Sequence, residues 1–293
     1  MIVVTGAGGF IGSVMVGYLN SLGRADIIVV DDLPEPSQFQ NLVGKQFSIM
    51  STEEVSNLFA TNPGYIEAVL HIGAISNTLH KDWPEIYKKN VLATRQWAWF
   101  CRDTKTPMVF ASTAAIYGNG NGPLNQYAFS KQISENEVVS DAACLRFFNV
   151  YGPNEYHKGR MASTILHWFN QSKDGVIKVF EDSENYRRDF IHVLDVCKTC
   201  WWIAQRENFR PGIYDLGTGV SRSFEELARI VSGYTGARIE YIPMPEDLAK
   251  QYQKDTKADV TALTDIGYDC TIMASLEKGV GDYLGYLKDH KYY

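Results

Sequence analysis

The first twenty residues, Met1 to Asn20, read MIVVTGAGGFIGSVMVGYLN, and they decide how the rest of the chain is interpreted. Residues 2–4 are an apolar run typical of a short buried strand. Gly6, Gly9 and Gly12 follow, and a helical pattern begins at once. These glycines would allow a tight turn, close approach of the backbone to a diphosphate, and tight helix–strand packing. Because the spacing is GxxGxxG rather than GxGxxG, the triplet alone leaves an ordinary glycine-rich turn as the alternative.

A second apolar run, residues 27–30, strengthens the first interpretation because it ends in Asp31 and Asp32. Asp31 lies 19 residues after Gly12, where a carboxylate accepts hydrogen bonds from ribose hydroxyls in dinucleotide-binding proteins. No Lys or Arg follows until Lys45, although NADP needs a cation near this point for its 2′-phosphate. The sequence therefore predicts a dinucleotide site for NAD. A distant cation that folds over the adenosine end would allow NADP.

Composition limits the classes of function that the chain can have. With 293 residues and 45% hydrophobic residues, it can form one large domain or two closely packed ones. The net charge of −6 argues against a nucleic-acid partner, and no apolar run is long enough to span a membrane. We expect no signal peptide, because the first strand starts at Ile2. Five cysteines indicate no disulfide framework, and Cys197 and Cys200 are interpreted as buried thiols rather than metal ligands, so a cytoplasmic location is expected.

Strand and helix patterns alternate along the chain. Strands are expected at 67–73, 107–112 and 142–152, and helices at 84–103 and 125–140. This alternation predicts an α/β fold, a Rossmann-like doubly wound parallel sheet with a smaller C-terminal α/β lobe. We predict a dinucleotide-binding domain at 1–149, with segments near 190–219 returning to it, and a mainly substrate-binding lobe at 150–293.

Tyr127 and Lys131 form a YxxxK pair on the expected helix, with both side chains on one face. A Lys ammonium would lower the pKa of a neighbouring Tyr, which is otherwise about 10, and so favour its use as a base. The strand that precedes this helix ends in two hydroxyls, Ser112 and Thr113, either of which could bond a substrate hydroxyl. YxxxK alone is common on solvated helix faces, so the strand-end hydroxyls carry the hypothesis of a catalytic pair.

Together these motifs resemble the extended short-chain dehydrogenase/reductase superfamily, in its nucleotide-sugar branch. More specific segments are RFFNVYGPNEYHKGRMAS at 146–163, FEDSENYRRDFIHVLDV at 180–196 and YDLGTG at 214–219. With EYIPMPEDLAKQYQKDTKADVTAL at 240–263 and GYD at 267–269, they are very similar to the ADP-L-glycero-D-manno-heptose 6-epimerase family. The resemblance covers the chain nearly end to end.

The resemblance implies an isomerase that oxidises the sugar at C6″ and reduces the ketone from the other face, in heptose synthesis for lipopolysaccharide. One bound NAD, or NADP, per subunit would take the hydride and return it. Tyr127 and Lys158 match the two acid/base residues, Thr113 the catalytic hydroxyl, and Lys131 the partner of Tyr127. Relatives form homo-oligomers, so a homo-oligomer is expected, and the resemblance implies no metal.

The resemblance also assigns the binding residues position by position. The residues that match the cofactor site are Gly6, Gly9, Phe10, Ile11, Gly12, Asp31, Asp32, Ile72, Gly73, Ala74, Ile75, Ser76, Asn90, Tyr127, Lys131, Val150 and Lys158. Those that match the substrate site are Thr113, Asn149, Arg160, His167, Phe180, Glu181, Asp182, Ser183, Arg188 and Tyr268. Arg188 is a natural diphosphate clamp, because a guanidinium bonds phosphate through two N–H groups.

The chain departs from the family in three ways. Tyr127 lies only 14 positions after Thr113, a shorter loop than in relatives, and the stretch from Lys131 to Asn149 is also short. Because these loops usually help to cover the sugar, its coverage and the substrate specificity would differ. Pro34, Gln38 and Glu53 replace basic residues that relatives use for NADP, which again favours NAD.

Three alternative functions stay open at this point. One is another nucleotide-sugar epimerase, for example a UDP-sugar 4-epimerase. A dehydratase is disfavoured because Ala114 and Ala115 stand where those relatives place an acidic pair. A dinucleotide-sensing or scaffold protein would usually have lost the Tyr or the Lys of the YxxxK pair, and this chain has both.

Overall fold

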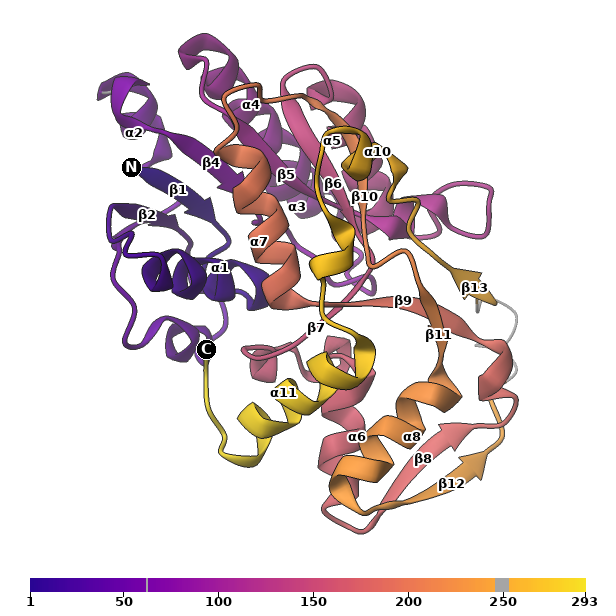
Figure 1. Cartoon of the computed structure of the whole chain (residues 1–293). Coiled ribbons are helices and arrows are strands. Elements are labelled where there is room, and N and C mark those ends of the chain that lie inside the picture. The colour runs from indigo at the N-terminus through magenta and orange to yellow at the C-terminus, as the bar shows by residue number, and fades with distance from the viewer. Residues whose placement is uncertain (62, 246–252) are drawn as a thin grey trace. The chain divides into compact units, whose positions relative to one another are not determined.

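The computed structural model describes residues 1–61, 63–245 and 253–293 (Figure 1). The chain divides into two compact units. The first contains Met1–Phe147, Val196–Tyr214 and Tyr293, and the second contains Phe148–Asp195 and Asp215–Tyr292. Residues 246–252, within the segment 240–263 that carries part of the family resemblance, lie outside the described residues. The assignment of a cofactor role to one part and a substrate role to the other stays a prediction.

The first unit is built on a seven-stranded sheet in the order β10-β6-β5-β4-β1-β2-β3. Its strands are β1 (Ile2–Thr5), β2 (Ile27–Val30), β3 (Ser48–Met50), β4 (Ala68–His71), β5 (Met108–Thr113), β6 (Ala142–Phe147) and β10 (Gly212–Leu216). β1 pairs in parallel with β2 on one side and with β4 on the other. The strand order therefore reverses at β1, which is where ligands bind in doubly wound sheets. The predicted fold class is confirmed.

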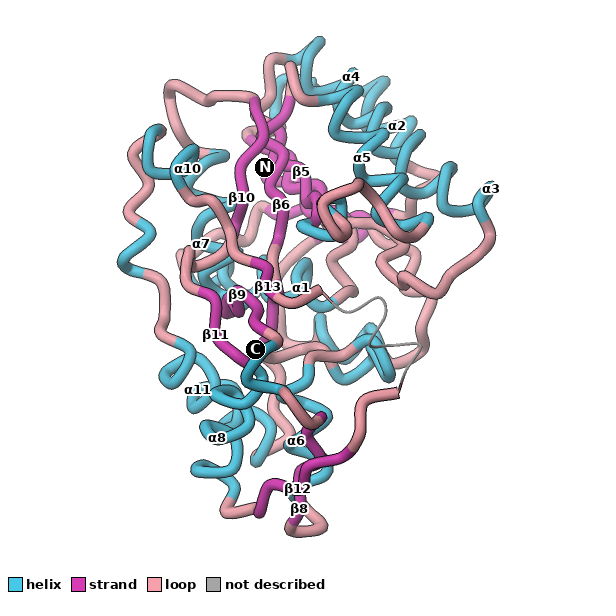
Figure 2. Tube along the Cα trace, turned by 90° about the vertical axis from the view of Figure 1, so that its right-hand side faces the viewer, coloured by secondary structure: helices cyan, strands magenta, loops and turns pink. Residues whose placement is uncertain are grey.

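Helices cover both faces of this sheet. They are α1 (Phe10–Ser21), α2 (Val55–Thr61), α3 (Trp83–Ile86), α4 (Ala93–Thr104), α5 (Gln126–Val138) and α7 (Val193–Ala204), with short turns η1 (Gln38–Leu42), η2 (Pro63–Tyr65) and η4 (Ala114–Tyr117). Figure 2 shows α4 and α5 on one face and α7 on the other. The central strands β1 and β4 are buried along their whole length, which explains their continuous apolar sequences. No helix among the described residues is long and apolar enough to cross a membrane.

The helix expected at 84–103 contains an interruption that was not predicted from the sequence. Between α3 and α4 lies a π-helical segment, η3 (Tyr87–Leu92). Asp82 caps the start of α3 by accepting a hydrogen bond from Glu85 N at 3.1 Å. Short π-helical segments are frequent at functional sites, and this one contains Asn90, a predicted cofactor residue.

The second unit combines short strands with three longer helices. The strands are β7 (Asn149–Tyr151), β8 (Val176–Phe180), β9 (Arg187–His192), β11 (Ser221–Ser223), β12 (Arg238–Ile242) and β13 (Asp255–Thr256). The helices are α6 (Thr164–Ser172), α8 (Phe224–Thr235), α10 (Thr261–Asp265) and α11 (Leu276–Lys288), with turns η5 (Tyr156–Met161), η6 (Ser183–Asn185) and η7 (Cys270–Ile272). Its core lies where α6, α8 and α11 meet β8, and includes Trp168, Val231 and Tyr283 (Figure 1). The strand expected at 142–152 is in fact two strands, β6 and β7, that belong to different units.

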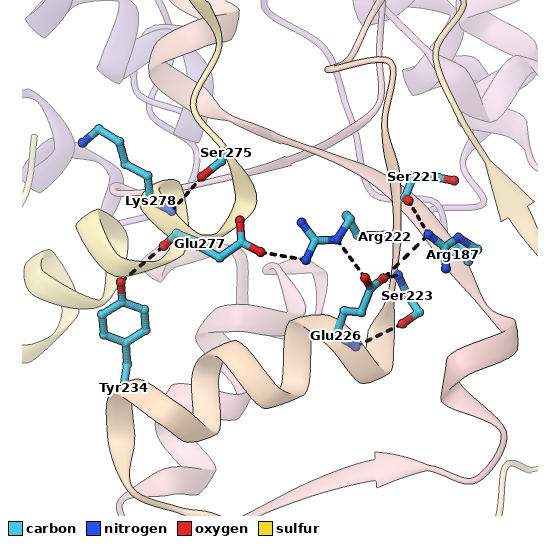
Figure 3. Close-up of polar contacts among 9 residues, drawn as sticks. All are labelled: Arg187, Ser221, Arg222, Ser223, Glu226, Tyr234, Ser275, Glu277 and Lys278. Carbon is cyan, nitrogen blue, oxygen red and sulfur yellow. Dashed lines mark hydrogen bonds and ion pairs between the residues drawn. The ribbon is translucent and has the colours of Figure 1, made fainter. Parts of the chain in front are cut away.

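A chain of charged contacts links four elements of the second unit (Figure 3). Arg222 of β11 donates to Glu226 of α8 at 3.0 Å and to Glu277 of α11 at 2.7 Å. Arg187 of β9 donates to the carbonyl of Ser221 at 2.6 Å and lies 3.6 Å from Glu226. These contacts fix the register of β9, the strand that carries the predicted diphosphate clamp.

Candidate active site

The glycine loop closes tightly on the end of β4. Gly6 has a φ of +65°, and a Cβ placed there would lie 2.4 Å from Gly73 Cα. A Cβ on Gly12 would lie 2.2 Å from the carbonyl oxygen of Gly6, so α1 packs directly on the loop. Gly9 is the N-cap of α1 and supplies no side-chain hydrogen bond to the helix. First-turn N–H groups therefore have no side-chain cap there, an arrangement that suits a phosphate.

Asp31 is bound into this loop. Its carboxylate accepts from Gly8 N and from Leu33 N, both at 2.8 Å, and burial raises the pKa of the group. Asn41, which the sequence reasoning did not single out, donates to the carbonyl of Gly8 at 2.9 Å. A partly buried carboxylate beside the loop is of the kind that suits ribose hydroxyls and disfavours an added phosphate. Asp32, also predicted as a cofactor residue, instead accepts from Thr52 N and Oγ1.

Lys45, the first cation after the acidic pair Asp31 and Asp32, has its hydrogen-bond partner outside the glycine loop. Its Nζ donates to the main-chain oxygen of Tyr293, and burial lowers its pKa to about 8. A Cβ on Gly17 of α1 would contact both Lys45 and Tyr293, so the Lys45 side chain lies against the second half of α1.

The two adjacent hydroxyls at the end of β5 have different hydrogen-bond partners. Ser112 is buried and donates to Glu135 Oε1 at 2.6 Å, and the same carboxylate pairs with Arg146 Nη2 at 2.7 Å. Thr113 is partly exposed and forms a hydrogen bond with Tyr127. Ser112 is therefore occupied by a buried ion pair, and Thr113 is the hydroxyl that contacts Tyr127.

Lys131 lies on α5, one turn after Tyr127, but it does not lower the pKa of Tyr127 as expected. Burial raises the pKa of Tyr127, and only the hydrogen bond with Thr113 opposes this effect. The Lys131 Nζ donates to the carbonyl of Ala111 at 2.6 Å. Burial lowers the pKa of Lys131 to about 7, with Glu135 opposing. The expectation treated the ammonium as fully charged, whereas a desolvated lysine loses part of its charge near neutral pH.

Asn90 joins the predicted cofactor segment to the helix that carries Tyr127. Its Oδ1 accepts from Ile75 N at 2.8 Å, and its Nδ2 donates to Ser130 Oγ at 2.9 Å. Ser130 Oγ in turn donates to the carbonyl of Tyr127 at 2.7 Å. Asn90 is fully buried, so its role among the predicted residues is to position both segments.

A buried histidine, which the sequence reasoning missed, connects β1, β4 and the first turn of α4. His71 Nδ1 lies 2.8 Å from Thr5 Oγ1, and His71 Nε2 lies 2.9 Å from Thr94 Oγ1. Thr94 donates its own proton to the carbonyl of Asn90, so it must accept from Nε2–H. Thr5 accepts from Gly73 N and gives its proton to Nδ1. His71 is therefore neutral, and burial lowers its pKa to about 3.

The second unit contains the other predicted site residues. Lys158 is partly buried in η5, and burial lowers its pKa while Glu155 raises it. Asn149, Arg160, Glu181 and Asp182 are exposed, Val150, His167 and Phe180 are partly buried, and Ser183 and Tyr268 are buried. Ser183 donates to Glu225 at 3.0 Å, so its hydroxyl supports the fold of this unit.

Arg188 lies beside an aromatic cavity that extends the predicted substrate site. Its Nη1 donates to the carbonyls of Arg187 and Gln253, and its guanidinium carbon is 5.6 Å from the ring centroid of Phe224. The cavity, of about 100 Å³, is lined by Thr164, Trp168, Lys178, Val179, Phe180, Ser183, Tyr186, Phe224 and Met244. Of these, only Phe180 and Ser183 were expected, because an aromatic in a helical or strand pattern is equally typical of a core.

A larger cavity lies between α2 and α4, and none of the predicted site residues lines it. Its volume is about 770 Å³, and Glu53, Phe59, Trp99 and Asp103 are among its lining residues. The two residues of the CxxC motif, Cys197 and Cys200, are buried on α7, as predicted, and neither forms a disulfide bond. No cluster of potential metal ligands occurs in the described part of the chain.

The doubly wound sheet, the glycine loop and the Thr113–Tyr127 pair are features typical of dinucleotide-dependent enzymes. A profile of the NAD dependent epimerase/dehydratase family matches residues 2–217, and the chain belongs to this family. It is 43% identical over 308 residues to the ADP-L-glycero-D-manno-heptose-6-epimerase of Brachyspira hyodysenteriae, covering 97% of this chain and 96% of that protein. It is an epimerase, and the isomerase class expected from the sequence is confirmed.

Solved structures agree with this assignment. The ADP-L-glycero-D-manno-heptose-6-epimerase of Helicobacter pylori superimposes with a TM-score of 0.86 at 27% identity, over 98% of this chain and 96% of that one. MoeE5, solved in complex with UDP-glucose and NAD, gives a TM-score of 0.79 at 24% identity, over 99% of each chain. The second likeness supports the fold alone.

Proposed function

We propose that this chain is an ADP-L-glycero-D-manno-heptose 6-epimerase, which interconverts the D-glycero and L-glycero forms of ADP-heptose. The observation that carries the proposal is the 43% identity along nearly the whole chain to a relative of that name. Because similarity at this level extends through both units, it includes the residues proposed here for the substrate as well as those for the cofactor. A cytoplasmic location and a homo-oligomer stay predictions.

The first unit has a site that fits NAD. The close approach of Gly6 to Gly73 leaves room only for backbone at the turn, and the α1 N-terminus beyond it suits a diphosphate. Asp31 would accept the ribose hydroxyls, and the engagement of Lys45 with Tyr293 supports NAD over NADP. We propose one NAD per subunit. When bound, NAD supplies a reversible hydride acceptor, so that no net oxidation of the sugar results.

Thr113 and Tyr127 would handle the proton on one face of the sugar carbon. Their hydrogen bond lets Thr113 hold the C6″ hydroxyl while Tyr127 Oη takes its proton. Lys131, with a pKa of about 7, would hydrogen-bond the nicotinamide ribose hydroxyls rather than set the pKa of Tyr127. The carbonyl of Ala111 fixes the Lys131 ammonium, so this cation is oriented before the substrate arrives.

Inversion needs a second acid/base residue for the opposite face, and we assign this role to Lys158. Partial burial lowers its pKa below that of a solvated lysine, which favours release of a proton from the amine. Its place in the HKG motif, which this chain shares with the family, is the basis for the assignment.

Recognition of the ADP group is assigned to the second unit. The cavity walls include Trp168, Tyr186 and Phe224, flat surfaces on which a base can stack. Arg188 contacts the same Phe224, which places a guanidinium beside the aromatic cavity. An aromatic cavity with an adjacent guanidinium suits a nucleoside diphosphate.

The decisive experiment incubates the purified chain with ADP-D-glycero-D-manno-heptose and follows the C6″ epimers by NMR. Equilibration without added cofactor is expected, and acid-denatured protein should release NAD. UDP-glucose and UDP-N-acetylglucosamine serve as matched substrates. Conversion of a UDP-sugar without conversion of ADP-heptose would replace the proposal with the 4-epimerase alternative.

The assignment of roles is tested separately with Tyr127→Phe, Lys158→Met and the double variant. Each single variant should lose at least about 100-fold in kcat, the usual contribution of a general acid or base. NAD content should remain in Lys158→Met. Full activity in either single variant would contradict the role given to that residue.

A further inference from the structure

The loop that presents Lys158 is held at both ends by one buried carboxylate. Glu155 is fully buried immediately before η5. Its Oε2 accepts from Ser163 N at 2.6 Å, and its Oε1 accepts from Ser163 Oγ at 2.5 Å. Ser163 is the N-cap of α6, eight residues later, so the carboxylate closes the loop and also lies at the positive end of that helix.

The same carboxylate is anchored to the last helix of the chain. Tyr283 of α11 donates to Glu155 Oε1 at 2.8 Å. Tyr283 is 1% exposed, and burial together with the Glu155 charge raises its pKa, so the phenol stays a donor. Three donors thus converge on Glu155, and three hydrogen bonds to an ionised group are each stronger than neutral ones.

Between the two ends, the backbone of the loop is constrained as well. Asn154, just before Glu155, is buried with a φ of +74°, and Gly159, just after Lys158, has a φ of +51°. Lys158 N donates to the carbonyl of Glu155 at 3.0 Å. The position of Lys158 therefore follows from the position of Glu155, three residues earlier.

We propose, resting on the proposed function, that Glu155 is a positioning residue for Lys158. It holds the 155–163 loop in the observed conformation and places a negative charge three residues before Lys158, which favours the protonated amine. Through Tyr283, the second acid/base residue of the reaction depends on α11. Among the described residues, Glu155 favours the charged amine of Lys158, and Lys158 in turn lowers the pKa of His157. From α11, Tyr283 contributes a neutral phenol.

The test measures Lys158 itself as well as turnover. Competitive acetylation of the full-length protein with acetic anhydride between pH 6 and 11, read by mass spectrometry of the Lys158 peptide, gives the pKa of this amine. Glu155→Gln removes the charge at nearly constant shape, and the pKa of Lys158 should fall by about one unit. The kcat with ADP-heptose should fall about tenfold or more, with KM changed by less than about twofold.

Two further variants separate charge from anchoring. Glu155→Asp keeps the charge on a shorter side chain and should restore the pKa of Lys158, while kcat stays reduced. Asp195→Asn is the matched control, because Asp195 is another buried carboxylate of this unit, bonded to Ala274 N at 2.8 Å. It should leave the pKa of Lys158 unchanged. Exposed Lys173 serves as an internal standard for the reagent.

An unchanged Lys158 pKa and a kcat within about twofold of wild type in folded Glu155→Gln would overturn the proposal. If that variant does not fold, Tyr283→Phe decides. Loss of the anchor should lower kcat severalfold with KM retained, and unchanged kcat would refute the link to α11. Should the wild-type protein fail to convert ADP-heptose, the proposed function fails, while the acetylation result still decides whether Glu155 controls Lys158.

Discussion

Removal of the one buried imidazole in the first unit should change how stability depends on pH. His71 accepts from Thr5 and donates to Thr94, and a proton added at Nδ1 would face the Thr5 hydroxyl that now donates to it. Its pKa is lowered from 6.5 to about 3, first by burial and then by the charge of Lys131. The unfolded chain therefore binds a proton between these two values, and the folded protein does not.

The sign and size of the pH effect on stability follow from this difference in proton binding between the folded and unfolded chain. Because the folded pKa is depressed, His71 costs nothing above pH 6.5, and stability is lost as pH falls through the range from 6.5 toward 3. Between pH 7.5 and pH 5.0, the titration of His71 should reduce the free energy of unfolding by about 2 kcal/mol. Other groups add their own pH dependence, so the quantity to compare is the difference between wild type and a variant without the imidazole.

His71→Gln is the variant of choice, because its amide is neutral throughout and offers both a donor and an acceptor. Urea unfolding followed by circular dichroism at pH 7.5 and 5.0 gives four free energies. The variant should be less stable at pH 7.5 by about 1–3 kcal/mol, since Thr5 and Thr94 lose well-placed partners. At pH 5.0 the gap to wild type should shrink by about 2 kcal/mol.

NMR provides an independent check. The chain has six histidines, and the ¹³Cε1 resonance that is missing from His71→Gln identifies His71. That resonance should not titrate between pH 5 and 8. A titration midpoint between pH 5.5 and 7 would refute the hydrogen-bond assignment, as would an unchanged stability gap between the two pH values.

Two other substitutions test the geometry of the first unit. Gly6→Ala should lower the free energy of unfolding by at least about 2 kcal/mol and abolish NAD retention, because its Cβ would meet the backbone of Gly73 at a positive φ. Calorimetry measures the stability and nucleotide release measures the bound NAD. A variant that keeps the wild-type Tm and its NAD would contradict the prediction. Glu135→Gln leaves the largely buried Arg146 without its carboxylate and should cost about 3 kcal/mol in urea unfolding, so a change below about 0.5 kcal/mol would show that the ion pair does not contribute.

Much of the framework could be predicted because its signals are local. A buried strand followed by glycines, the second strand ending in Asp31, and Tyr127 with Lys131 one helical turn apart are all encoded within a few residues. The parallel sheet followed from the alternation of strands and helices, and the reversal of strand order at β1 then explains why the predicted cofactor residues lie at strand ends.

The partners of those residues could not be predicted, because each contact joins positions far apart in the chain. Ser112 and Thr113 are adjacent in the sequence and both carry a hydroxyl. Only the packing of α5 on β5 decides that Ser112 bonds to Glu135 and Thr113 bonds to Tyr127. The effect of Lys131 on Tyr127 was misjudged for the same reason, since desolvation is a property of the packed core.

The sequence by itself determined the class of fold, the family and the residue types that carry the chemistry, because these depend on patterns of neighbouring residues. The tertiary structure alone decided which polar groups are satisfied by the protein and which are left for a ligand. Lys45 is bound to Tyr293, and Glu155 to Ser163 and Tyr283, across separations of up to 248 residues. Such pairings arise only when the order of strands and the packing of helices bring those side chains together.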